Sequence, residues 1–218
     1  MEIILIRHGE SEHNSGTTQV RDCWITPLGR QQAARAAEAL RGETIDRFYC
    51  SLQRRGMETA SIIAGELDLD IRLCPDITEH GFSGEEPGLS RSEIARRFPR
   101  VVLTDDIDEG GCLRRWGDET VEALSARTRQ TAEWFRALAV DEELVTLACV
   151  IHGTSGSWIL RHLLGADFDG RVRFAHRNCG ITRLRIEPNG TVIVRAINET
   201  GHLAGLPLTT PAPEAASP

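Results

Sequence analysis

The sequence contains no lysine, and all 25 of its basic residues are arginine. Acidic residues outnumber them at 32, which gives a formal net charge of -7. A surface that binds nucleic acid generally needs a basic excess, because its cations must displace the counterions around the phosphates. We therefore expect no nucleic-acid partner, and any phosphate-binding site in this protein must be local.

Long hydrophobic runs are also absent. The N-terminal apolar run, residues 3–6, ends at Arg7 and is far too short for the core of a signal peptide or a membrane helix. With 40% apolar and 26% charged residues, the composition is that of an ordinary globular protein. We expect no membrane partner and a cytoplasmic location.

The sequence lacks the cysteine and histidine spacings of common metal and redox sites. None of its six cysteines forms a CxxC pair, and no HExxH motif occurs. Several of the cysteines lie in apolar runs, which is typical of buried free thiols in a reducing compartment. The sequence therefore predicts no metal site and no other cofactor.

What is present is an alternation of strand and helix patterns. The apolar runs 3–6 and 144–151 are typical of strands that are covered on both faces in a parallel sheet, and residues 46–50 predict a shorter strand. Helical patterns follow at residues 26–40, 57–67, 90–98, 120–138 and 158–165. This order predicts an α/β fold.

The C-terminal part and one internal segment depart from that alternation. Residues 181–186 and 191–197 flank Pro188-Asn189-Gly190, which predicts an antiparallel hairpin at the sheet edge. Turn residues and weak periodicity at about 83–118 predict a small helical cap insertion rather than sheet. We expect a three-layer sandwich with a mostly parallel central sheet and helices on both faces. It would form a single domain, residues 1–206, with a disordered tail at 207–218.

Reactive and cationic side chains follow three of the predicted strands. Arg7 and His8 end the first strand, Arg54 and Arg55 follow the second, and His152 ends the long run 144–151. Ligands of open α/β sheets bind beyond these strand ends, and so concentrated a positive charge favours a phosphate ligand.

The residue types at these strand ends suit phosphoryl chemistry. Arginine forks bind phosphate oxygens at any relevant pH, and a neutral His8 could attack phosphorus. We expect Arg7, Arg55 and a protonated His152 to stabilise the negative charge that develops in the reaction.

Four blocks in this order resemble the histidine phosphatase superfamily, also called phosphoglycerate mutase-like. The matching residues are Leu5-Ile6-Arg7-His8-Gly9-Glu10 with Asn14; Ser51, Arg55 and Thr59-Ala60; Glu79 and Phe82; and His152-Gly153 after an apolar strand. With minor features added, the resemblance runs from Ile3 to Leu203.

The resemblance implies a mechanism and a set of roles. His8 would become a phosphohistidine, so that no metal is required to make the nucleophile, and Glu79 would act in turn as acid and base. Arg55, rather than Arg54, would bind the phosphate. Asn14, Thr26 and Gly153 would also bind the substrate, a small phosphate ester.

The substrate and the exact activity stay open at this point. A phosphomonoester hydrolase is favoured over a phosphoglycerate mutase, because the segment between Glu79 and His152 is short for the mutases of this family. The Arg114-Arg115 pair favours the mutase, since those enzymes hold a substrate carboxylate with an arginine pair. A catalytically silent phospho-ligand-binding protein is a third alternative.

One segment argues against transferring a substrate preference from relatives. Phosphatases of the family often carry Phe-Gly-x-Trp-Glu-Gly after the acid, and this chain has Phe82-Ser83-Gly84-Glu85-Glu86-Pro87 instead. The sequence also leaves open whether the protein forms a homodimer.

Overall fold

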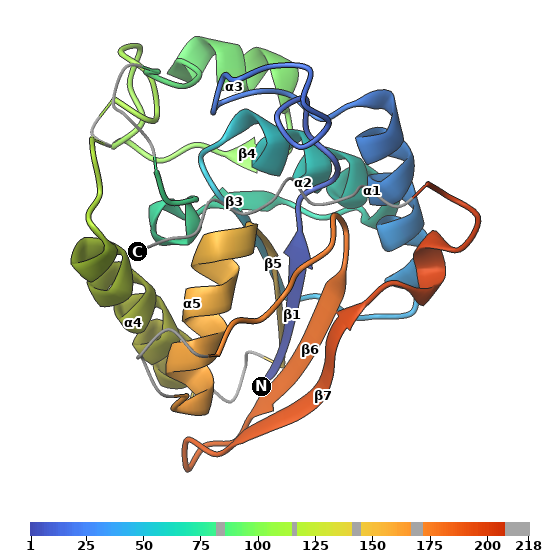
Figure 1. Ribbon diagram of the computed structural model, residues 1–218, viewed down its shortest axis with the longest axis vertical. Coiled ribbons are helices and arrows are strands. Elements are labelled where there is room, and N and C mark those ends of the chain that lie inside the picture. The colour runs from blue at the N-terminus through green and yellow to red at the C-terminus, as the bar shows by residue number, and fades with distance from the viewer. Residues whose placement is uncertain (82–85, 115–116, 141–144, 167–171, 208–218) are drawn as a thin grey trace.

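A seven-stranded sheet forms the centre of the molecule, within the residues that the computed structural model describes: 1–81, 86–114, 117–140, 145–166 and 172–207. The order of the strands is β4-β3-β2-β5-β1-β6-β7 (Figure 1). Their bounds are β1 Glu2–Arg7, β2 Arg47–Cys50, β3 Ile71–Leu73, β4 Val101–Val102, β5 Thr146–Ile151, β6 Ile181–Ile186 and β7 Val192–Glu199.

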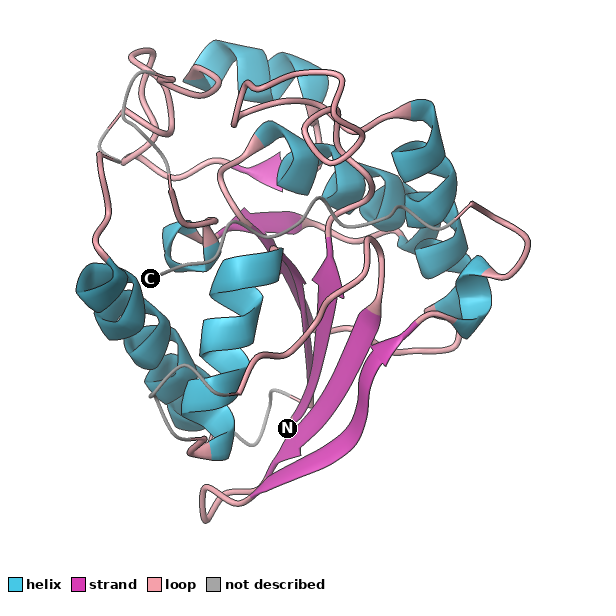
Figure 2. Ribbon diagram, viewed as in Figure 1, coloured by secondary structure: helices cyan, strands magenta, loops and turns pink. Residues whose placement is uncertain are grey.

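Helices cover this sheet on both faces (Figure 2). Their bounds are α1 Pro27–Ala39, α2 Arg54–Leu67, α3 Arg91–Arg97, α4 Val121–Leu138 and α5 Gly153–Leu164, with 3-10 turns η1 Pro75–Ile77 and η2 Gly201–Leu203. Among the described residues, no helix combines the length and the apolar character that crossing a membrane would require.

The central strand β1 shows how the two faces are filled. Ile4 and Ile6 pack into the cluster that contains the alanine-rich face of α1 and the apolar face of α2. Ile3 and Leu5 point the other way, into the cluster formed with α4 and α5. Each fully buried side chain of this size contributes about 1.5–3 kcal/mol. The predicted three-layer α/β fold is confirmed.

The register of the sheet brings three strand ends to the same level. β1 and β5 are parallel, with Arg7 opposite Ile151, and β2 and β5 are parallel, with Cys50 opposite Val150. On the other side of β1, the antiparallel strands β6 and β7 form the predicted edge hairpin. The residues that follow β1, β2 and β5 therefore come out beside one another.

The helix ends agree with the patterns that predict them. The Thr26 side chain accepts a hydrogen bond from the Gly29 N–H at the start of α1, and Ser90 forms a capping box with Glu93 at α3. Gly165 ends α5 with a φ of 63°, a left-handed conformation that glycine adopts without strain.

The segment predicted as a cap contains the helix α3, but the expectation that it contributes no strand to the sheet is wrong. Val101 pairs with Ile71, which makes β4 an edge strand parallel to β3. Ile94 of α3 and Phe98 are buried in the same core as α1 and α2. Strands of two and three residues are too short to show a period of two. The predicted tail lies outside the described residues from 208 onward.

Candidate active site

Two histidines from distant parts of the chain meet beyond the strand ends. His8 follows β1, and His152 follows β5 and precedes the first turn of α5. Both side chains are buried, and their ring centroids are 4.9 Å apart with an angle of 52° between the rings. The sheet thus brings the two imidazoles to one place.

Arg55 joins this pair from the first turn of α2. Its Nε donates a hydrogen bond of 3.2 Å to His8 Nε2, and its Nη2 donates one of 3.1 Å to Gln53 Oε1. Its Nη1 donates to the Arg21 carbonyl oxygen. Burial lowers the pKa of the guanidinium, and Glu79 provides the largest opposing charge.

The neighbouring Arg54 faces elsewhere. Its Nε lies 3.2 Å from Asp22 Oδ2, and its guanidinium carbon lies 5.4 Å from the centre of the Trp24 ring. Adjacent residues on a helix point about 100° apart, which explains why only one of the two arginines reaches the histidines.

The hydrogen bonds of His8 define its protonation. Nδ1 lies 2.7 Å from the Gly9 carbonyl oxygen, which can only accept, so Nδ1 carries the proton. Nε2 receives the Arg55 donor and therefore presents its lone pair. Burial, followed by the charges of Arg55 and Arg7, lowers the pKa of His8 well below its usual value. A neutral imidazole with a lone pair on Nε2 is the form that can attack phosphorus.

His152 has a hydrogen-bond partner at Nε2 and a lowered pKa. Its Nε2 lies 2.7 Å from Ser51 Oγ, but burial and then the nearby Arg55, His8 and Arg7 lower its pKa well below the usual value. This shift favours the neutral form, whereas the sequence predicts a protonated His152 beside the phosphoryl group, so that expected role stays a prediction. Two arginines already occupy the same buried site, and a third cation there would be repelled.

Arg7 borders the same site from the end of β1. A Cβ atom on Gly153 would lie 3.6 Å from its guanidinium carbon, so the guanidinium lies against the start of α5. Its Nη1 donates to the His176 carbonyl oxygen. Arg7 and Gly153 are thus direct neighbours.

The backbone around His8 is held by close packing and polar contacts. The Gly9 N–H donates to Thr59 Oγ1 at 3.0 Å, and a Cβ on Gly9 would come within 2.4 Å of the Gly29 carbonyl oxygen. Asn178 Nδ2 donates to both the His8 carbonyl oxygen, at 3.0 Å, and Asn14 Oδ1, at 3.1 Å. Asn14 therefore lies one side chain away from the His8 backbone.

Glu79 is anchored at the N-terminus of α5. Oε2 accepts from the Thr154 N–H at 2.9 Å, and Oε1 accepts from the N–H groups of Ser155, at 2.8 Å, and His80, at 2.9 Å. The positive end of a helix dipole favours a carboxylate at this place. Its own N–H donates to Gln53 Oε1 at 3.3 Å, so Gln53 links Glu79 to Arg55.

Two of the predicted substrate-binding residues have partners away from the histidines. The Thr26 hydroxyl donates to Glu10 Oε1 at 2.7 Å and caps α1, which uses its only proton. Arg114 is exposed and forms an ion pair of 2.7 Å with Asp108. Arg115 and residues 82–85 lie outside the described residues.

Sequence reasoning missed several residues that the structure places here. Gln53 lies between the matched Ser51 and Arg55, so its position in that block was an available signal. His176 and the Arg21 carbonyl gave none. Arg127 of α4, described below, occupies a helical position where an arginine would be expected to face solvent.

Within the described part of the chain, no group of three or more histidine, cysteine or acidic side chains could hold a metal ion. Metal independence stays a prediction, which a chelator can test.

The fold and the paired histidines at its strand ends define an α/β protein with a buried, cationic site suited to phosphate. The family model described as the histidine phosphatase superfamily, branch 1, matches residues 3–199, and the chain belongs to this superfamily. The resemblance read from the four blocks is thereby confirmed.

Relatives carry the names of both mutases and phosphatases. A 2,3-bisphosphoglycerate-dependent phosphoglycerate mutase of Thermoplasma acidophilum is 32% identical over 57% of this chain and 64% of its own length. The serine/threonine-protein phosphatase PGAM5 of rat is 28% identical over 92% of this chain and 63% of its own length. The chain thus spans less than two thirds of these two proteins. It covers 84% of a protein from Photorhabdus laumondii named "Probable phosphoglycerate mutase GpmB", at 28% identity over 84% of this chain.

Solved structures share the fold. Phosphoserine phosphatase from Entamoeba histolytica, in complex with 3-phosphoglyceric acid, is 27% identical, with a TM-score of 0.65 over 93% of this chain and 98% of that chain. A mycobacterial glucosyl-3-phosphoglycerate phosphatase has a TM-score of 0.64 at 21% identity, over 91% and 99% of the two chains, and supports the fold alone.

Proposed function

We propose that this protein is a phosphomonoester hydrolase that acts on a small phosphorylated metabolite through a phosphohistidine at His8. The observation that carries the proposal is the neutral His8 imidazole, whose Nε2 lone pair faces the Arg55 guanidinium. Membership in the histidine phosphatase superfamily supports the same reading.

In the first step, His8 Nε2 attacks the phosphorus atom, and the bond from phosphorus to the leaving oxygen breaks. Glu79, in its protonated form, gives its proton to that oxygen. Arg55 and Arg7 turn their donors to the phosphoryl oxygens, where negative charge is stabilised by fixed cations. His152, whose ring centroid lies 4.9 Å from that of His8, would supply a further hydrogen bond.

In the second step, water attacks the phosphohistidine and the bond from phosphorus to Nε2 breaks. The carboxylate of Glu79 takes the proton from the water, which restores the acid for the next turnover. Inorganic phosphate and the free imidazole are the products. This cycle requires neither a metal nor another cofactor.

Replacement of the nucleophile tests the proposal. His8→Ala should lower turnover by about 10⁴-fold or more and abolish an acid-labile phosphoenzyme trapped by rapid quenching. His162→Ala removes a different imidazole, in the last turn of α5, and should keep both the turnover and the phosphoenzyme. Retained turnover in His8→Ala would rule out the covalent mechanism.

A phosphoglycerate mutase is the second candidate, and the names of two of the relatives favour it. The ion pair of Arg114 with Asp108 weighs against it, because it engages one member of the proposed arginine pair. Incubation with 3-phosphoglycerate and a bisphosphoglycerate primer separates the two activities. Formation of 2-phosphoglycerate without inorganic phosphate would establish the mutase.

A panel of phosphorylated metabolites, run with and without a chelator, tests the substrate class and metal independence together. We expect release of inorganic phosphate that a chelator does not change, and inhibition by the chelator would contradict the proposed cycle. Inactivity on the whole panel with retained phosphate binding would indicate a binding protein instead.

A further inference from the structure

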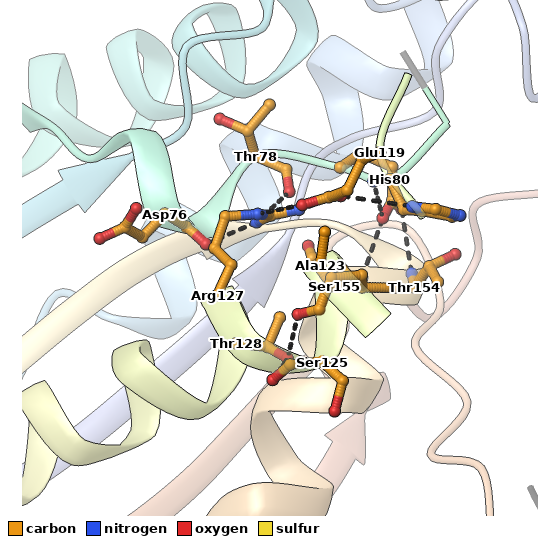
Figure 3. Close-up of polar contacts among 12 residues, drawn as sticks. Asp76, Thr78, His80, Glu119, Ala123, Ser125, Arg127, Thr128, Thr154 and Ser155 are labelled. Carbon is orange, nitrogen blue, oxygen red and sulfur yellow. Dashed lines mark hydrogen bonds and ion pairs between the residues drawn. The ribbon is translucent and has the colours of Figure 1, made fainter. Parts of the chain in front are cut away.

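A buried arginine of α4 lies at the centre of the contacts behind Glu79. Arg127 is 8% exposed, and its Nη1 donates to two backbone carbonyl oxygens, that of Asp76 at 2.6 Å and that of Thr78 at 2.9 Å. Both carbonyls belong to the segment that leads directly into Glu79. Figure 3 shows the Arg127 side chain reaching this segment from its helix.

Arg127 also forms a bidentate ion pair with the carboxylate of Glu119. Arg127 Nε and Nη2 each lie 2.7 Å from one oxygen of Glu119, a two-pronged pair of the kind that fixes orientation as well as distance. Burial raises the pKa of Glu119, but the hydrogen bonds and charges of Arg127 and His80 outweigh it and lower the pKa overall. Glu119 therefore stays ionised within the network.

Glu119 also contacts His80, the residue that follows Glu79. Glu119 Oε2 lies 3.3 Å from His80 Nδ1, and the His80 N–H donates to Glu79 Oε1 at 2.9 Å. Figure 3 shows the His80 ring beside Glu119, with Thr154 and Ser155 nearby. The chain is thus held before Glu79 by Arg127 and after it by Glu119.

We infer that Arg127 and Glu119 are positioning residues for the acid–base carboxylate, acting on Glu79 through the backbone of residues 76–80. This inference rests on the proposed function, which assigns Glu79 its proton-transfer role. A misplacement of about 1 Å can cost a catalytic group about a hundredfold in rate, so a rigid support has a measurable consequence. The support comes from Arg127 of α4 and from Glu119, which lies two residues before that helix begins.

The leaving group provides the readout. An alkoxide leaving group depends strongly on protonation by Glu79, whereas p-nitrophenolate leaves with little help. The value of kcat/KM reports the steps up to phosphohistidine formation, in which the leaving oxygen is protonated. We therefore compare n-butyl phosphate with p-nitrophenyl phosphate.

Glu119→Gln, which keeps the shape but removes the charge, should lower kcat/KM for n-butyl phosphate by about ten- to a hundredfold. The loss for p-nitrophenyl phosphate should be at least several times smaller, and Arg127→Met should show the same imbalance. Thermal unfolding midpoints are measured in parallel. If Arg127→Met does not fold, Glu119→Gln alone decides.

Arg136→Met is the matched control. Arg136 also belongs to α4 and donates to two backbone carbonyl oxygens, those of His162 and Leu163, but these lie at the far end of α5. Arg136→Met should change kcat/KM by the same factor for both substrates. An equal loss on both substrates in Glu119→Gln, or no loss on either, would overturn the inference.

A double variant separates this inference from the proposed function. In a Glu79→Gln background, Glu119→Gln should add no further imbalance, because the group it positions is gone. An added imbalance would show that Glu119 acts by another route. If Glu79→Gln alone leaves the ratio of the two substrates unchanged, it is the proposed role of Glu79 that fails.

Discussion

The two ends of the proposed site are built in different ways. At the phosphate end, three buried residues follow three neighbouring strands. His8 follows β1, His152 follows β5, and Arg55 lies in the first turn of α2, the helix that follows β2. At the leaving-group end, Glu79 lies half-buried in a connecting segment and is held by backbone N–H groups and by the network of Arg127, Glu119 and His80.

The positions of the catalytic side chains are therefore fixed by different interactions at the two ends. The phosphate end inherits its geometry from the sheet, whose strands are fixed by hydrogen bonds and by two packed cores. The leaving-group end depends on a few charged side chains, all of which lie outside the strands of the sheet. We expect the phosphate end to tolerate little change and the other end to be adjustable.

The largest expected effect concerns the adjacent arginines at the phosphate end. Arg55→Met removes the donors that face His8 and should lower kcat/KM by about 10²- to 10³-fold, as when a fixed donor to transition-state charge is lost. Arg54→Met removes a contact to Asp22 and should cost less than about tenfold. Steady-state kinetics on p-nitrophenyl phosphate measures both, and equal losses would show that the two arginines share the site.

A second test disturbs the backbone that presents His8. Gly9→Ala would force a Cβ within 2.4 Å of the Gly29 carbonyl oxygen, which belongs to backbone and cannot rotate away. It should lower the free energy of unfolding by about 1–3 kcal/mol, the usual cost of overpacking. In Gly42→Ala, the added Cβ has no neighbour within 4 Å, so this control should be nearly neutral in urea unfolding. A neutral Gly9→Ala would show that the loop can shift.

The contrast also explains what the sequence could predict. His8, Arg55, Glu79 and His152 stand in short local blocks, and the apolar runs before two of them identify the strands. Arg127 carries no such signal, because its importance arises from carbonyl groups about 50 residues away along the chain. The strand β4 was missed for a related reason, since two residues pair with β3 only through the packing of the segment around them.

The pH dependence of stability is a third test, through a histidine beside the phosphate end. His176 is buried, neither of its ring nitrogens has a hydrogen-bond partner among the residues that the structure describes, and burial together with Arg7 lowers its pKa to about 4. The unfolded chain, with a pKa of about 6.5, binds more protons between these values, so this contribution to stability is present above pH ~6.5 and lost as the pH falls.

Urea unfolding of wild type and His176→Gln at pH 7 and pH 5 measures this contribution. The wild-type free energy of unfolding should fall more steeply with decreasing pH, by about 1.4 kcal/mol per pH unit within that window. If the free energy of unfolding changes with pH equally in the two proteins, His176 is protonated to the same extent in the folded and the unfolded state.

The smallest expected effect concerns Thr26, which the resemblance assigns to phosphate and the structure assigns to the start of α1. Thr26→Ala removes the N-cap and should lower the free energy of unfolding by about 1 kcal/mol. Thr26→Ser keeps the capping hydroxyl and should restore most of that stability. Because the hydroxyl proton goes to Glu10, kcat/KM should change little in either variant. A large loss of kcat/KM in Thr26→Ala, with stability unchanged, would show that Thr26 acts at the phosphate end. The role in capping α1 would then not be its main one.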